Sequence, residues 1–146
     1  APLVADLNAR IAAKATPVLQ NRLGAVYARY GVFDKAEAAF REAAKSDYPQ
    51  AWYNLGNIKF LRKDWKGALS DYERSLRLNP GSAPAAIAVA RAAFELGDAA
   101  KASESWKAAS AIDPARAAEF SYVAGGGTST GRASDAGSRD VLGWDE

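Results

Sequence analysis

Hydrophobic residues recur every three or four positions along much of the chain, and the pattern is clearest in residues 49–82. Two such stretches follow each other there, separated by the polar pair Lys63-Asp64. This spacing places side chains on one face of an α-helix. The pattern therefore predicts two amphipathic helices joined by a tight turn. Their apolar faces are formed by Trp52, Leu55, Gly56, Ile58 and Phe60 in the first helix and by Ala68, Leu69, Tyr72, Leu76 and Leu78 in the second.

The same helix pair recurs along the sequence. Asn79-Pro80 and Asp113-Pro114 lie 34 residues apart, and six further pairs match at that offset. A fixed period of this length is typical of stacked helical repeats. We therefore predict a first unit at 17–48, whose offset is 32 residues, a second at 49–82 and a third at 83–116. The six pairs are Leu55 with Val89, Phe60 with Phe94, Asp64 with Asp98, Ala68 with Ala102, Tyr72 with Trp106 and Leu78 with Ile112.

These repeats resemble the tetratricopeptide family. Its pattern, W-x2-L-G-x2-Y followed by A-x3-F, A and P, is matched by Trp52, Leu55-Gly56, Ala68, Tyr72 and Pro80 in the second unit. The other two units match it in part. The departures from the pattern are Lys59 and Ser75 in the second unit and Ala86 in the third. The resemblance implies an all-α, right-handed α-solenoid of three units.

Both ends differ from the repeats. Residues 1–16 are predicted to form an N-terminal capping helix, and 117–124 a C-terminal capping half-helix, because end repeats must cover an exposed core face. Residues 125–140 are rich in Gly, Ser, Thr and Ala, which is typical of a flexible linker. Residues 141–146, Val-Leu-Gly-Trp-Asp-Glu, combine apolar and acidic side chains and form a candidate docking peptide.

Composition removes several classes of function. The chain has no Cys and no His, so thiolate chemistry and the commonest general base and metal ligand are lacking. No paired carboxylates or phosphate-binding loop stand out, and we expect no enzymatic activity, no cofactor and no metal. No apolar stretch is long enough to cross a membrane. The alanine-rich, Met-free start favours an exported bacterial protein only slightly over a cytoplasmic one.

Charge is divided unevenly. Residues 1–116 carry a net charge of +5 and residues 117–146 one of −3. A basic body favours acidic partners, although ordinary surface charge gives the same balance. Four basic residues around one helix turn leave an RNA-binding helical repeat as the alternative function, but the modest net charge leads us to expect no nucleic acid. They are Lys59, Arg62, Lys63 and Lys66.

The family resemblance implies a function in protein–protein interaction. The first helix of each unit lines a concave groove that holds a peptide or helix. The acidic-terminus clamp of some relatives is mostly missing here, with Asn54 its one match, so no chaperone partner is predicted. Arginine and asparagine in the groove suit a partner with acidic and apolar residues. The predicted groove residues are Asn21, Arg22, Arg29, Tyr53, Asn54, Asn57, Phe60, Ile87, Arg91 and Phe94.

The chain's own end suits this groove. Asp145 and Glu146 carry charge opposite to the groove arginines, and we expect them to meet Arg22, Arg29 or Arg91. We expect the apolar Val141, Leu142 and Trp144 to pack on Tyr53, Phe60 or Phe94. Docking within one chain would cover the groove, whereas docking on a neighbour would give a head-to-tail homo-oligomer. Both arrangements stay open at this point.

Overall fold

The computed structural model describes residues 2–125 and 143–146. All regular structure in these residues is helical, and no strand is present among them. Eight α-helices and one 3-10 helix are described. They are α1 (Pro2–Ala13), α2 (Pro17–Arg29), α3 (Phe33–Ala44), α4 (Pro49–Leu61), α5 (Trp65–Leu78), α6 (Ala83–Glu95), α7 (Ala99–Ile112), α8 (Pro114–Ala118) and η1 (Ser121–Val123).

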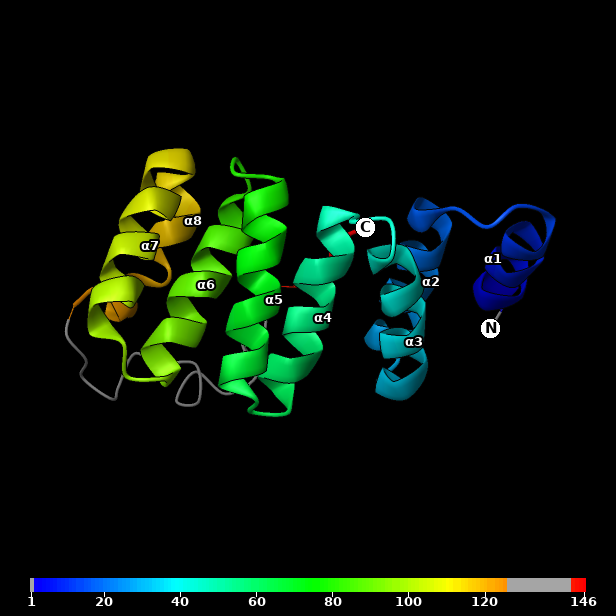
Figure 1. Cartoon of the computed structure of the whole chain (residues 1–146), viewed down its shortest axis with the longest axis horizontal. Coiled ribbons are helices and arrows are strands. Elements are labelled where there is room, and N and C mark those ends of the chain that lie inside the picture. The colour runs from blue at the N-terminus through cyan, green and yellow to red at the C-terminus, as the bar shows by residue number, and fades with distance from the viewer. Residues whose placement is uncertain (1, 126–142) are drawn as a thin grey trace.

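The helices stack as pairs in chain order. The α2–α3, α4–α5 and α6–α7 pairs pack most extensively, and α3 with α4 and α5 with α6 join neighbouring pairs. Figure 1 shows the resulting row of helices, with α1 at one end and α7 and α8 at the other. The predicted all-α solenoid of three helix pairs is therefore confirmed.

Local sequence explains where the helices begin. The side chain of Thr16 accepts a hydrogen bond from the Leu19 amide, and Pro17 occupies the first turn of α2. Asp64 and Asp98 cap α5 and α7 in the same way. Such caps satisfy amide groups that the first helical turn leaves without partners.

The turn inside each helix pair has one residue in the left-handed region. These are Gly31, Lys63 and Gly97, with φ angles of 75°, 62° and 82°. They occupy equivalent places in the three units. Glycine adopts this conformation without a steric penalty, which explains its use in two of the three turns.

Helices within a pair approach closely where glycine faces an aromatic ring. A Cβ atom added to Gly24 would lie 2.5 Å from the Phe40 ring, and one added to Gly56 would lie 2.5 Å from the Tyr72 ring. Both rings are buried. The Leu-Gly dipeptide of the repeat pattern therefore provides room for the aromatic residue of the same unit.

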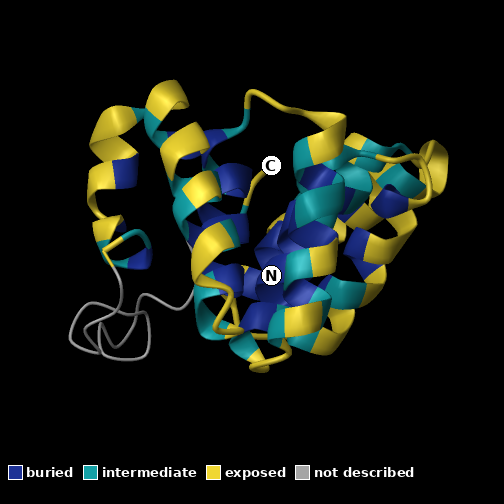
Figure 2. Ribbon diagram, turned by 60° about the vertical axis from the view of Figure 1, so that its left-hand side comes forward, coloured by how far each residue is buried: buried dark blue, intermediate teal, exposed yellow. Residues whose placement is uncertain are grey.

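The core runs along the row rather than gathering at one centre. Several clusters of buried side chains follow each other, each formed between adjacent helices. Figure 2 shows buried residues on the facing sides of the helices and exposed residues on their outer sides. This arrangement leaves the first helices of neighbouring units, α2 and α4, side by side along one face.

Candidate functional site

The C-terminal segment, residues 143–146, lies against α2 and α4. Figure 1 shows the chain end beside these helices, far along the sequence from both. We call the surface that it contacts the A-helix face, defined by Asn21, Arg22 and Arg29 of α2 and Asn54 and Asn57 of α4. All five residues are in the predicted groove set.

Asn54 pairs with the main chain of Asp145 through both halves of its amide. Its Oδ1 accepts a hydrogen bond from the Asp145 amide at 2.9 Å, and its Nδ2 donates to the Asp145 carbonyl at 2.7 Å. Nδ2 also donates to Oδ1 of Asn21 at 2.9 Å, and Asn21 Nδ2 donates to the same Asp145 carbonyl at 2.8 Å. Two buried side-chain amides thus bond both main-chain groups of one residue, as a neighbouring strand would.

Asn57 extends this pattern by one contact. Its Nδ2 donates to the carbonyl of Gly143 at 2.8 Å. Its Oδ1 accepts a 2.7 Å hydrogen bond from the hydroxyl of Tyr72, which lies beneath it on α5. Because a hydroxyl donor must face the amide oxygen, Tyr72 directs the Asn57 amino group toward the ligand side.

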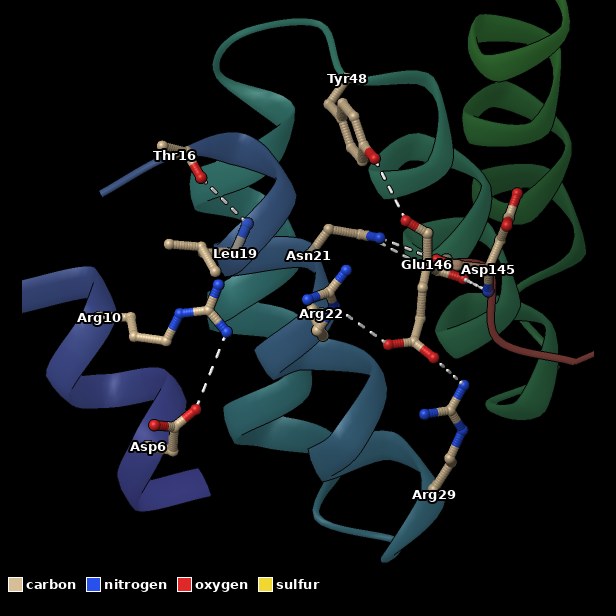
Figure 3. Close-up of polar contacts among 11 residues, drawn as sticks. Asp6, Arg10, Thr16, Leu19, Asn21, Arg22, Arg29, Tyr48, Asp145 and Glu146 are labelled. Carbon is tan, nitrogen blue, oxygen red and sulfur yellow. Dashed lines mark hydrogen bonds and ion pairs between the residues drawn. The ribbon is translucent and has the colours of Figure 1, made fainter. Parts of the chain in front are cut away.

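Two arginines of α2 face the carboxylate of Glu146 (Figure 3). Arg29 Nη2 lies 2.8 Å from Oε2, and Arg22 Nε lies 3.5 Å from Oε1. Arg22 and Arg29 are seven positions apart, about two helical turns, so they project from the same side of α2. The hydroxyl of Tyr48, in the loop before α4, donates to the Glu146 carbonyl at 3.2 Å.

Trp144 anchors the segment by its ring. The ring stacks on Phe40 with centroids 6.1 Å apart and an interplanar angle of 18°. It also lies 6.2 Å from the Phe33 ring in a tilted arrangement. Trp144 is thereby packed against the core cluster between the first and second units, which includes Ala25 and Ala28.

The side chain of Asp145 faces a different environment from its main chain. A cavity of about 240 Å³ lies beside the segment and is lined by Tyr53, Pro84, Arg116, Gly143, Trp144 and Asp145. Partial burial raises the pKa of the Asp145 carboxyl, an effect that the charge of Arg116 opposes and that of Glu146 adds to. No hydrogen bond or ion pair of this carboxylate occurs among the described residues.

Tyr53 contributes to the wall of this cavity rather than to hydrogen bonding with the segment. It is buried, and its ring lies 5.8 Å from that of Tyr72. Burial raises the pKa of the Tyr53 hydroxyl to about 12. The phenol is therefore neutral throughout the physiological range.

Arg91, one of the predicted groove cations, contacts side chains of the repeat stack and of the residues that follow it. Its guanidinium lies between the rings of Phe60 and Phe120, 4.8 Å and 5.0 Å from their centroids. Its Nε donates to the Tyr122 hydroxyl at 3.4 Å. Cation–π contacts of this kind hold an arginine in place.

The remaining groove residues of the third unit are covered by the chain that follows it. Ile87 is fully buried in a cluster with Ala117 and Phe120. The Phe94 ring meets that of Tyr122 edge-on at 5.1 Å. In this arrangement α8 and η1 occupy the space that the sequence assigned to a ligand, so the A-helix face ends at the second unit.

The contacts of the segment differ in part from those expected. Trp144 packs on Phe33 and Phe40 instead of Tyr53, Phe60 or Phe94, because Phe60 is already covered by Arg91 and by the edge of Trp65. Glu146 meets Arg22 and Arg29 as expected. Val141 and Leu142 lie outside the described residues.

Sequence reasoning did not single out four residues that contact the segment or orient its partners. Tyr72 was placed on the apolar face of its helix, and Phe33 and Phe40 lie on the helix at the equivalent place in the first unit. Tyr48 precedes Pro49 in the shortened loop of the first unit, and a tyrosine at the start of a groove-lining helix was the available signal.

Two of the four basic residues behind the RNA-binding alternative are paired with acidic side chains. Lys59 forms a 2.8 Å ion pair with Asp71, and Arg62 pairs with Asp34 and Glu37 at 3.2 Å and 2.9 Å. Within 2–125 and 143–146 no group of acidic residues is placed to hold a metal ion. No helix in that part is long and apolar enough to cross a membrane.

Stacked helix pairs with an exposed face of first helices define the class of helical-repeat scaffolds, which bind other proteins through such faces. A family model described as the tetratricopeptide repeat matches residues 49–82, the second unit. The second unit is therefore a tetratricopeptide repeat, as the resemblance predicted.

A solved structure supports the fold. The crystal structure of MamA matches with a TM-score of 0.71 and 21% sequence identity, over 84% of this chain and 77% of that chain. At this identity the likeness concerns the fold alone. No curated protein matches the chain.

Proposed function

We propose that the A-helix face binds an extended stretch of polypeptide, and that the C-terminal segment is one such ligand. The chain's tetratricopeptide repeat supports a general role as a protein–protein interaction scaffold. The single observation that carries the finer proposal is the pairing of Asn54 with both main-chain groups of Asp145. A side-chain amide that bonds both the N–H and the C=O of one residue in this way binds extended chain and does not suit a helix, whose main-chain groups are already paired.

Burial strengthens this interpretation. Asn21, Asn54 and Asn57 are at most 1% exposed with the segment in place. Polar groups removed from water must be hydrogen-bonded, and leaving one without a partner costs about 1–3 kcal/mol. The face is thus built to be covered by a chain that supplies one donor and two carbonyl acceptors.

Docking within one chain is the arrangement we favour. Seventeen residues, 126–142, connect η1 and the following turn to the segment. A tether of this kind gives an effective concentration on the order of millimolar, so that even a weak ligand docks. The segment of a second chain would have to compete with the tethered segment. Head-to-tail association is therefore expected only when the protein concentration approaches that effective concentration.

Deletion of 141–146 tests the proposal. The shortened chain should bind a free peptide of sequence 141–146, measured by fluorescence anisotropy, whereas the full chain should bind it at least tenfold more weakly because its face is occupied. Replacing Asn54→Ala in the shortened chain should reduce peptide affinity by about tenfold or more. Asn8→Ala, at an exposed asparagine of α1, is the matched control and should have no effect.

Light scattering over a range of concentrations separates the two arrangements. Docking in one chain predicts a monomer for both the full and the shortened protein at low concentration. Multimers of the full chain that disappear on deletion would assign the segment to a neighbouring molecule. Equal masses combined with no peptide binding would remove the proposed function.

A further inference from the structure

We propose that the A-helix face recognises a three-position motif, tryptophan, any residue, glutamate, and does so without requiring a free chain end. The natural partner would then be a protein that presents this acidic, aromatic motif in an extended segment, in competition with the chain's own residues 143–146. This inference rests on the proposed function and specifies the ligand of the same face.

The tryptophan position is selected by shape and stacking. Phe33 and Phe40, both on α3, contact the Trp144 ring. Two small residues of α2, Ala25 and Ala28, belong to the same cluster. A site lined by small alanine side chains, with the buried Phe40 ring beneath it, has room for a large flat ring. Aromatic pairs in such geometry contribute about 0.5–1.5 kcal/mol beyond the area they bury.

The middle position is recognised through its main chain. The amide and carbonyl of Asp145 are both bonded by Asn54, and the carbonyl also by Asn21. The carboxylate of Asp145 borders the cavity near Arg116 without a hydrogen bond among the described residues. Contacts to main-chain groups do not depend on residue type, so this position should accept many side chains.

The glutamate position is selected by charge and reach. One carboxylate oxygen of Glu146 faces Arg29 and the other faces Arg22, and the two arginines stand two turns apart on α2. A shorter aspartate side chain would place its oxygens nearer the main chain and away from one arginine. Both arginines are partly exposed, so this selectivity should weaken as salt rises.

The main-chain carboxylate of Glu146 is not recognised through its charge. Its contact is the 3.2 Å hydrogen bond from the Tyr48 hydroxyl to the carbonyl of Glu146, and an internal residue offers the same acceptor. Within the described part of the chain the two arginines of the A-helix face, Arg22 and Arg29, pair with the Glu146 side chain instead. An internal motif should therefore fit as well as a terminal one.

Peptide titration of the full chain tests the motif. The protein carries Trp144→Ala, which weakens its own segment and leaves the repeats intact. Fluorescent peptides of sequence 141–146 are added in five forms: parent, Trp144→Ala, Asp145→Ala, Glu146→Gln, and parent extended by a Gly-Ser-Gly-Ser sequence at its end. Circular dichroism confirms that the protein is folded. We expect the Trp144→Ala and Glu146→Gln peptides to bind about tenfold or more weakly, and the other two within about threefold of the parent.

A charge exchange provides a second readout that folding defects cannot imitate. Arg29→Glu in the same protein should weaken the parent peptide about tenfold, and a Glu146→Arg peptide should recover part of the loss. Arg77→Glu, at an exposed arginine of α5 without a described ion pair, makes the same change in net charge and should leave affinity unaltered.

The outcomes separate the two proposals. If no peptide binds, the proposed function itself fails. If the parent binds but the Trp144→Ala and Glu146→Gln peptides bind equally well, the face binds peptide and the motif is wrong. Loss of binding on extension would show that a free chain end is required and would overturn the internal motif.

Discussion

The amide of Asn54 illustrates how single residues are placed by their neighbours. It is bonded to Asn21 on α2 and to the Asp145 main chain, and Tyr72 performs the same orienting role for Asn57. The location of these asparagines in the groove was predicted from the sequence, because the family pattern assigns their positions to it. The direction in which each amide points could not be predicted, since it depends on donors from other helices.

Asp145 makes docking dependent on pH. Its pKa is raised in the docked state, chiefly by partial burial, above the ordinary value of 3.8. A raised pKa means that the protonated form docks better, so its contribution should improve docking as pH falls through the raised pKa and level off near the ordinary value.

The difference between wild type and Asp145→Asn isolates this effect from the titration of Glu146. The C-terminal segment of the variant should dock more tightly at neutral pH. Its docking should also lack the part of the pH dependence that comes from the Asp145 carboxyl. NMR titration of the docked fraction between neutral and acidic pH measures it. Identical profiles for the two proteins would show that the Asp145 carboxyl experiences no burial on docking.

Gly56 is the residue where close packing has the clearest consequence. Gly56→Ala would bring a Cβ to 2.5 Å from the buried Tyr72 ring. Overpacking costs about 1–3 kcal/mol, more than the gain of up to about 1 kcal/mol in helix propensity. We expect a net loss of about 1 kcal/mol or more in urea unfolding.

Gly81→Ala is the control for Gly56→Ala. The nearest atom to an added Cβ there is Asn79 Oδ1, at 3.9 Å. The change should stay within about 0.5 kcal/mol. Equal effects at both sites would indicate that the helix pairs separate more easily than their packing implies.

At the scale of elements, the repeat period was sufficient to locate the helix pairs. The Leu-Gly and aromatic positions that defined the units are the same residues that touch across each pair, such as Gly24 with Phe40. Local patterns predict such contacts because both partners lie in one unit. The sequence analysis predicted a C-terminal cap at 117–124, but not that α8 and η1 would cover Ile87 and Phe94, because these contacts join residues about 30 positions apart.

Helix α1 is attached by a single fully buried side chain, Leu7. Its neighbours are in α2 and α3, among them Leu23 and Ala39. Leu7→Ala should lower stability by about 2–3 kcal/mol, or less if α1 detaches before the rest unfolds. Hydrogen exchange should show faster exchange in α1 with α4–α6 unchanged.

Leu3→Ala serves as the comparison for α1, because Leu3 is 51% exposed. It should leave exchange in α1 nearly unchanged. Faster exchange throughout the repeats in Leu7→Ala would mean instead that α1 is an integral part of one cooperative unit.

At the scale of the whole molecule, the solenoid presents two different halves. The first two units expose a face whose amides and arginines contact residues 143–146, while the third is closed by α8 and η1. This division explains why the predicted groove residues fall into two groups. It also places the acidic end of the chain on its basic body, in line with the uneven charge of the sequence.

The side-chain amide signals of Asn21, Asn54 and Asn57 test the central claim most directly. Their NMR spectra should be compared between the full chain and its Trp144→Ala variant at low protein concentration. If the A-helix face holds residues 143–146, all three signals should shift in the variant and move back when the free parent peptide is added. Unchanged signals in the variant, together with no response to the peptide, would contradict the account.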